Sequence, residues 1–208
     1  MNAASRPAIV LASRSPRRLE LARAEGWLVT VTPPDEAVEA DQPPRGPGES
    51  LAAFVQRLAF AKAEAVAATG AEGTIVACDT LSEVAGTVLG KPADATEARR
   101  MLQALSGRRH RVLTGVCVWH RPDGRPRQGV AESLLEMGPL SEDFLAWYLA
   151  SGLWVGKAGA CGFQDERLPL ALVAGSPSNV VGLPLELLRE MLAGVGESER
   201  RSRDETGT

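Results

Sequence analysis

Short strand-like runs alternate with helical stretches along most of this chain, and this alternation is what most limits how it can fold. The strand-like runs are apolar and bounded by turn residues, and they cover Ala8–Ala12, Leu28–Thr32, Thr74–Cys78, Val112–Trp119, Gly129–Met137 and Ala171–Ala174. Strands that alternate with helices indicate an α/β fold with helices flanking a sheet. With 208 residues, 44% of them hydrophobic, the chain can form one compact domain or two small lobes, and we expect a single domain over residues 1–193.

The helical stretches have recognisable starts and stops. The clearest covers Ser50–Thr69, where apolar residues recur at helical spacing, Ser50 is a suitable N-cap and Gly70 follows as a stop. Shorter helices are expected over Thr96–Leu105, Ser141–Ala150 and Pro184–Leu192. Two strings, Ala85-Gly86 and Pro122-Asp123-Gly124, are typical of hairpin turns.

Composition and charge exclude several classes of protein. The net charge is only −3 and the Lys and Arg residues are scattered, so a nucleic-acid polymer is not an expected partner. The apolar run Ala8–Ala12 is too short for a signal or membrane segment, which predicts a cytoplasmic protein that does not bind a membrane. Cys78, Cys117 and Cys161 lack the spacing of a disulfide framework or a zinc site and are expected to be reduced. Residues 194–208 carry almost no apolar side chains and are expected to form a disordered polar tail.

Five prolines crowd the segment after the second strand-like run, and they are Pro33, Pro34, Pro43, Pro44 and Pro47. Proline fixes φ and removes a backbone donor, so this segment is expected to be neither helix nor central strand. It is expected at the surface or over a site. Glu36 within it can complete a hard-cation site with Asp79, although most acidic loops only face water.

The first chemical motif is S-R-S-P-R-R, Ser13 to Arg18, placed where a buried strand ends and a helix begins. Ser15 is expected to cap the helix and Pro16 to occupy its first position. Backbone N–H groups and two hydroxyls would then face outward beside Arg17 and Arg18, which is the outline of a phosphate site. An ordinary capped helix with two solvated arginines is the alternative.

The second motif is V-A-C-D-T, Val76 to Thr80, an apolar strand expected to end on Asp79 and Thr80. Open α/β sheets bind ligands at the carboxyl ends of their strands. Asp79 is therefore a candidate metal ligand or general base, and a carboxylate that caps the following turn is the alternative.

Three further polar residues stand where they can meet a ligand. Lys62 lies on the apolar stripe of its helix, so it either extends to water or reaches an anion from the core side. Lys91 lies in L-G-K-P, a bend that either aims its ammonium into a cleft or exposes it to solvent. Gln164 follows G-F, and its amide carries the donor and the acceptor needed to read a base edge, unless it is only a surface residue. By contrast, the late string S-N-V-V-G-L-P-L, Ser178 to Leu185, is expected to be a strand or loop with an architectural role.

Taken in order, several motifs resemble the Maf family of nucleotide pyrophosphatases. They are L-A-S-R-S-P-R-R, R-L-A-F-A-K-A, A-C-D-T, L-G-K-P, L-S-G-R-R-H-R-V-L-T-G-V, K-A-G-A-C-G-F-Q and N-V-V-G-L-P-L. The match extends from about residue 8 to residue 192. Several motifs in one order are far more specific than any one of them.

This resemblance implies a mixed α/β fold of the ITPase-like kind, with two lobes and flanking helices around a central nucleotide cleft, usually as a homodimer. It also implies that a nucleoside triphosphate is hydrolysed between its α- and β-phosphates with a divalent cation, Mg²⁺ or Mn²⁺. By the same resemblance Asp79 is the proton acceptor, and Glu36 and Asp79 are the metal carboxylates. The residues that would meet the phosphates or lie beside them are Ser13, Ser15, Arg18, Lys62 and Lys91.

Base specificity in the family varies at three positions near the nucleobase, and here these are Arg17, Thr80 and Gln164. All three resemble the branch of dTTP/UTP pyrophosphatases, so dTTP, UTP or modified pyrimidine nucleotides are the expected substrates. Two neighbours depart from the family pattern, with Gly156 in place of an acid and Asp165 in place of a glycine. The readings that stay open are a 7-methyl-GTP pyrophosphatase and a nucleotide-binding regulator of septum formation without turnover.

Overall fold

The computed structural model describes residues 6–40 and 43–193, so the predicted polar tail, residues 194–208, lies outside the described residues. The described chain divides into two compact units. Unit 1 takes in residues 6–79, 115–130 and 183–193, and unit 2 takes in residues 80–114 and 131–182. Each unit is considered by itself below, and a single domain over residues 1–193 stays a prediction.

The strands form one mixed sheet, which confirms the predicted mixed α/β class. They are β1 (Ala8–Leu11), β2 (Leu28–Val31), β3 (Gly73–Val84), β4 (Thr87–Leu89), β5 (Arg109–Arg121), β6 (Arg127–Met137) and β7 (Leu170–Ala174). The strand order is β2-β1-β3-β5-β6-β7, with β4 paired to β3. β1 lies parallel to both β2 and β3, whereas the pairs β3–β4 and β6–β7 are antiparallel.

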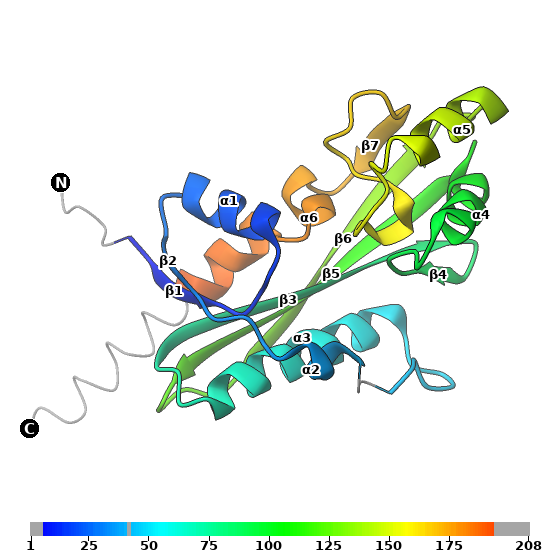
Figure 1. Cartoon of the computed structure of the whole chain (residues 1–208). Coiled ribbons are helices and arrows are strands. Elements are labelled where there is room, and N and C mark those ends of the chain that lie inside the picture. Colours follow the sequence, from blue (N-terminus) through cyan, green and yellow to red (C-terminus); the bar gives the residue numbers. More distant parts are fainter. Residues whose placement is uncertain (1–5, 41–42, 194–208) are drawn as a thin grey trace, which may run out of the picture. The chain divides into compact units, whose positions relative to one another are not determined.

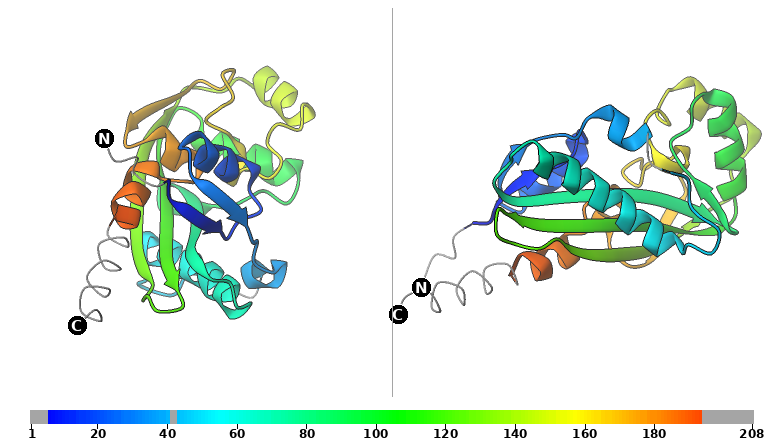
Figure 2. Two further views of the ribbon diagram at one scale, coloured as in Figure 1. Left: turned by 90° about the vertical axis from the view of Figure 1, so that its left-hand side faces the viewer. Right: turned by 90° about the horizontal axis from the view of Figure 1, so that it is seen from below.

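Unit 1 has a core on each face of its strands because side chains alternate along a strand. In β3, Val76 and Cys78 belong to one buried cluster, and Ile75 and Ala77 belong to the other. The first cluster is covered by α1 (Pro16–Ala24) and the helical residues 185–193, and the second by α3 (Leu51–Ala68). Figure 1 shows α1 and α3 on opposite sides of the strands, and Figure 2 shows α3 lying along its face.

α3 approaches β5 more closely than side chains would allow. A Cβ atom on Gly115 of β5 would lie 2.1 Å from the backbone oxygen of Val55 and 2.7 Å from the backbone nitrogen of Gln56. Val55 is fully buried. Because Gly115 has no side chain, the backbone of α3 can pack directly against the backbone of β5.

Unit 2 packs its helices around a separate core. Its elements are α4 (Ala95–Leu105), α5 (Glu142–Ala150), a 3₁₀ turn (Ala158–Ala160) and α6 (Pro177–Val181), with β4 and β7. Asp94 caps α4 by accepting the N–H of Glu97, and Ser141 caps α5 by accepting the N–H of Phe144. The buried side chains of this core include Leu102 and Tyr148. Among the described helices, none is long and apolar enough to cross a membrane.

The observed elements correct three predictions. The sequence pattern ended the third strand at Cys78, but β3 continues to Val84 because it forms a hairpin with β4 through the predicted Ala85-Gly86 turn. Residues Glu36–Ala40 of the proline-rich segment form a short helix, α2, whose first turn is stabilised by the Asp35 carboxylate accepting the N–H of Ala37 at 3.0 Å. The string around Ser178 was expected to be strand or loop, yet it forms α6, which starts at a Ser-Pro pair and ends at a left-handed glycine.

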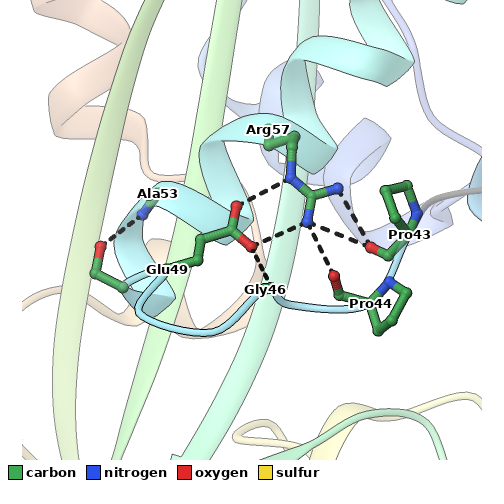
Figure 3. Close-up of polar contacts among 7 residues, drawn as sticks. Pro43, Pro44, Gly46, Glu49, Ala53 and Arg57 are labelled. Atoms are coloured by element: carbon green, nitrogen blue, oxygen red, sulfur yellow. Dashed lines mark hydrogen bonds and ion pairs between the residues drawn. The ribbon is translucent and has the colours of Figure 1, made fainter.

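Residues 43–49 of the proline-rich segment are held onto α3 by the ion pair of Arg57 with Glu49 (Figure 3). Arg57 of α3 donates to both oxygens of the Glu49 carboxylate, at 2.9 and 3.0 Å, and to the backbone oxygens of Pro43 and Pro44. The backbone N–H of Gly46 donates to the same carboxylate at 3.0 Å. These contacts tie residues 43–49, which form neither helix nor strand, to α3.

This ion pair predicts a pH dependence of the segment. The Arg57 hydrogen bond, and after it the Gly46 N–H, lower the pKa of Glu49 from its ordinary value of 4.5 to about 2. Because the pKa is lowered by folding, the stabilisation is complete above about pH 4.5 and is lost as the pH falls through about 2. In an NMR titration, the amide shift of Gly46 is expected to move with a midpoint near 2. Arg57→Ala should raise the midpoint toward 4.5, and a wild-type midpoint near 4.5 would contradict the prediction.

Candidate functional site

The turn after β1 brings together Ser13 and Arg18, as the sequence predicts. Ser15 caps α1 by accepting the backbone N–H of Arg18 at 3.4 Å, and Pro16 lies in the first turn. The Ser13 hydroxyl oxygen accepts the backbone N–H of Ser15 at 3.1 Å and the Arg18 guanidinium at 3.3 Å. Ser13 is buried, whereas Ser15, Arg17 and Arg18 are half-buried. A serine, a guanidinium and a helix start therefore lie together, which suits an anion.

Lys62 does not extend to water, although that is the usual arrangement for a lysine on an apolar stripe. Its ammonium is 2.6 Å from Oδ1 of Asp79, and only 7% of the residue is exposed. The Asp79 side chain is 16% exposed. A charge-assisted hydrogen bond of this length fixes both groups, and removing either partner would leave the other charge desolvated.

Asp79 lies within β3, not at its end, yet it is past the end of the neighbouring parallel strand. The last residue pair between β1 and β3 is Leu11 with Val76. β3 extends three residues beyond that pair before it reaches Asp79. The prediction that this strand ends on Asp79 and Thr80 is therefore wrong, but Asp79 does lie beyond the carboxyl end of the neighbouring parallel strand, because β1 stops and β3 does not.

The pKa of Cys78, the residue before Asp79 on β3, is affected by the charges around it. Burial raises the pKa of Cys78 to about 11, and the positive charges of Arg18 and Lys62 oppose that rise, while Asp79 adds to it. Arg18, Lys62 and Asp79 are thus close enough to Cys78 to act on it. Unit 1 gathers two cationic side chains, one carboxylate and the Ser13 hydroxyl around the middle of β3.

Glu36 is placed differently from the expectation for a metal ligand. Its carboxylate is 82% exposed and pairs with Arg14 at 3.4 Å, and Arg14 also donates to the backbone oxygen of Pro34 at 3.1 Å. Within residues 6–40 and 43–193, no three His, Cys, Asp or Glu side chains are grouped so that they could hold a metal ion. A metal held by Glu36 and Asp79 together stays a prediction.

In unit 2, Thr80 lies on β3, the first strand of the β3–β4 hairpin, and Lys91 follows β4, the second strand. The Thr80 hydroxyl oxygen is 3.0 Å from that of Thr114 on β5. Lys91 is exposed in the bend after β4, and the preceding Gly90 accepts the N–H of Gly159 at 2.9 Å. That bond ties the L-G-K-P bend to the turn of the K-A-G-A motif.

Gln164 is exposed at the tip of a tight turn in unit 2. The N–H of Asp165 donates to the oxygen of Gly162 at 3.0 Å, which makes Gln164 the third residue of a β-turn. Oδ1 of Asp165 accepts the backbone N–H of Arg167 at 3.2 Å and its Nε at 3.3 Å, and the Arg167 guanidinium lies 4.6 Å from the centre of the Trp147 ring. The Asp165 side chain is only 6% exposed, so this departure from the family pattern anchors the turn.

Two residues of this region were missed from the sequence. Thr114 is fully buried and bonds to Thr80, and Asn179 of α6 is 1% exposed and bonds to β5 and β6. A threonine in an apolar strand carries no local signal of such a role. An asparagine directly after Ser-Pro-Ser is a weak signal of a capped turn, but nothing in the sequence places it against β5.

The comparisons with known proteins agree with the motifs. The family model described as "Maf-like protein" matches residues 8–195. A protein of Rhodopirellula baltica named "dTTP/UTP pyrophosphatase" is 42% identical and covers 88% of this chain and 80% of its own length. Proteins with the same name from Anaeromyxobacter sp. and Symbiobacterium thermophilum are 45% and 42% identical, each over 90% of this chain and over 89% and 94% of their own length.

Solved structures are more distant. The Ham1 protein of Staphylococcus aureus is 18% identical, with a TM-score of 0.40 over 62% of this chain and 71% of that chain. A HAM1 protein of Coxiella burnetii is 20% identical, with a TM-score of 0.40 over 63% of this chain and 73% of that chain. Likeness at this level adds nothing to the fold, which the strand pairing itself establishes.

Proposed function

The chain belongs to the Maf family, and we propose on that basis that it is a nucleoside triphosphate pyrophosphatase acting on dTTP and UTP. The observation that carries the proposal is the ion pair of Lys62 with Asp79, which belongs to the same unit as the turn of Ser13 and Arg18 that we propose to bind phosphate. Phosphoryl transfer depends mainly on positioning and charge neutralisation, and these are the groups it needs.

In this proposal Asp79 accepts the proton of the attacking water. The water oxygen bonds to the α-phosphorus, the bond from that phosphorus to the α,β-bridging oxygen breaks, and pyrophosphate leaves. Lys62 keeps the Asp79 carboxylate oriented at the moment of attack, because a short charge-assisted bond restricts its rotation. Arg18, with Ser13 to position it, and Lys91 are proposed to bind the phosphates.

A divalent cation, Mg²⁺ or Mn²⁺, is part of the proposal. Carboxylate oxygens are the hard ligands such ions prefer, and magnesium commonly takes one or two of them together with substrate phosphates, so Asp79 and Glu36 have the donor chemistry for this role, although Glu36 pairs with Arg14 in this structure. Bound there, the cation would neutralise charge on the triphosphate. Binding would require Glu36 to exchange its Arg14 partner for the ion.

Pyrophosphate release is the direct test of the function. dTTP, UTP, CTP, GTP and 7-methyl-GTP would each be supplied with magnesium, with manganese and with chelator, and pyrophosphate and orthophosphate would both be measured. Metal-dependent pyrophosphate from dTTP and UTP is expected. Release from 7-methyl-GTP alone would move the chain to the other branch of the family, and saturable binding without release from any nucleotide would make it a nucleotide-binding regulator.

Base selection is proposed to depend on Arg17, Thr80 and Gln164, and Gln164→Glu tests this. The amide both donates and accepts, whereas a carboxylate only accepts, so a uracil carbonyl loses its donor while the N–H groups of guanine gain an acceptor. The ratio of kcat/KM for UTP to that for GTP is expected to fall by roughly 10- to 100-fold. Gln103→Glu on the exposed side of α4 is the matched control, and an equal fall in both variants would remove Gln164 from this role.

The assembly and location remain part of the proposal. We expect a homodimer in the cytoplasm that binds neither a membrane nor a nucleic-acid polymer. Analytical ultracentrifugation of the purified chain tests the dimer, since a single species at the monomer mass would exclude it.

A further inference from the structure

Three polar groups of unit 2, which come from Asn179, Thr114 and Thr80, are linked by contacts of hydrogen-bond length. The Thr114 hydroxyl is fully buried and lies 3.0 Å from the Thr80 hydroxyl and 3.2 Å from the backbone oxygen of Asn179, to which it donates. Thr80 directly follows Asp79 in the sequence and is half-buried. The chain of contacts therefore runs from the buried Asn179 of α6 to Thr80, which is proposed to meet the nucleobase.

The protons in this chain can be assigned by counting. A carbonyl oxygen only accepts, and a threonine hydroxyl has a single proton to donate. If Thr114 gave its proton to Thr80, two oxygens with no proton between them would face each other at 3.2 Å in a fully buried place, at the cost of an unmade bond. Both contacts are satisfied only when Thr114 donates to Asn179 and Thr80 donates to Thr114.

The acceptor at the end of the chain cannot turn away. The side-chain nitrogen of Asn179 donates to the backbone oxygen of Val112 at 3.1 Å and to the Ser133 hydroxyl at 2.9 Å. The backbone oxygen of Asn179 also accepts the N–H of Gly182 at 2.9 Å, where the helix ends in a left-handed residue with φ of 105°. The direction of the backbone carbonyl of Asn179 is thus fixed both by the bonds of its own side chain and by the N–H of Gly182.

We infer that Thr114 and Asn179 fix the polarity of the Thr80 hydroxyl, so that Thr80 meets the nucleobase as a hydrogen-bond acceptor only. The inference rests on the proposed function, which places Thr80 at the base. Uracil and thymine carry a proton on N3, whereas N3 of cytosine is an unprotonated acceptor. An acceptor of fixed polarity favours the imide N3–H of dTTP and UTP and repels cytosine, and Thr114 is a positioning residue for this selection.

Thr114→Val tests the polarity. Valine keeps the shape but removes the acceptor that holds the Thr80 proton, so Thr80 can turn and donate to N3 of cytosine. The ratio of kcat/KM for UTP to that for CTP is expected to fall by about five- to tenfold, chiefly through a lower KM for CTP. Thr114→Ser keeps the hydroxyl and is expected to retain the wild-type ratio.

If Thr114→Val alters the UTP to CTP ratio by acting through the Thr80 hydroxyl, its effect should vanish when Thr80 has no hydroxyl. In a Thr80→Val background, adding Thr114→Val is therefore expected to leave the UTP to CTP ratio where Thr80→Val alone puts it. The inference would be overturned if folded Thr114→Val kept the wild-type ratio of UTP to CTP. A lower ratio in Thr114→Ser, or a ratio in the double variant that differs from that of Thr80→Val alone, would overturn it as well. If Thr114→Val does not fold, Thr114→Ala is measured in the same way.

Binding separates this inference from the function it rests on. Calorimetry of UMP and CMP with wild-type and Thr114→Val protein needs no turnover, and the preference for UMP is expected to fall by the same factor. If wild type releases no pyrophosphate but Thr114→Val still weakens the UMP preference, the function is wrong and the polarity holds. If wild type hydrolyses UTP and neither ratio changes, the function holds and the polarity is wrong.

Discussion

Asp79→Asn is expected to lower kcat for pyrophosphate release by about 10²- to 10⁴-fold, the range a general base contributes. Asparagine has nearly the same shape and still offers an oxygen to Lys62, which is 2.6 Å from the carboxylate in the wild type. It cannot take a proton from water. The loss is therefore expected in kcat with a smaller change in KM, as for an interaction needed in the transition state.

Folding must be separated from chemistry in this test, because Asp79 faces a buried lysine. The neutral amide leaves the Lys62 charge less well compensated, so a lower melting temperature is expected for Asp79→Asn, without loss of the folded state. Asp143→Asn, on the exposed first turn of α5, makes the same chemical change elsewhere in the chain. Retention of most of the wild-type kcat by Asp79→Asn would end the assignment of Asp79 as the base.

Gly115→Ala is expected to destabilise the protein by about 3 kcal/mol, a large effect for one added methyl group. The new Cβ would lie 2.1 Å from the backbone oxygen of Val55 and 2.3 Å from its carbonyl carbon. Backbone atoms cannot rotate away as a side chain can, so α3 as a whole must shift. The melting temperature should fall by roughly 6–12 °C, and denaturant unfolding would give the free energy directly.

The same shift is expected to reach the proposed active site. Lys62 is seven residues after Val55 on α3, which is two helical turns along the same side of the helix. A displaced α3 therefore moves Lys62 away from Asp79, and kcat is expected to fall along with stability. Gly46→Ala is the matched control, since a Cβ there meets nothing within 4 Å and its φ is ordinary. A loss below about 1 kcal/mol in Gly115→Ala would show that α3 adjusts without strain.

Local sequence signals predicted the starts of the helices well. Ser15, Ser50 and Ser141 each accept a backbone N–H three residues later; Ser15 and Ser50 were expected as N-caps, and Ser141 as the start of its helix. The Ala85-Gly86 turn also lies where the sequence indicated, with positive φ at both residues. These features depend on groups only a few residues apart, so the nearby sequence is enough to define them.

The length of β3 was not predictable in the same way. The apolar run ends at Cys78, and the next residues, Asp79, Thr80 and Ser82, are polar. The strand continues because β5 lies beside β3 in the sheet and residues 82–84 pair with β4. Pairing with another strand outweighed the change in side-chain character.

The α/β class, the ends of most helices, the family and the residue types available for phosphate chemistry thus follow from the amino-acid order alone. The tertiary structure alone decided what those residues contact: Lys62 with Asp79 across 17 positions, Thr114 with Asn179 across 65, and α3 against Gly115. These two groups of features differ in how far apart along the chain the interacting residues lie. Caps and turns are set by neighbouring backbone groups, whereas the partner of a buried charge or hydroxyl depends on which distant segments pack beside it.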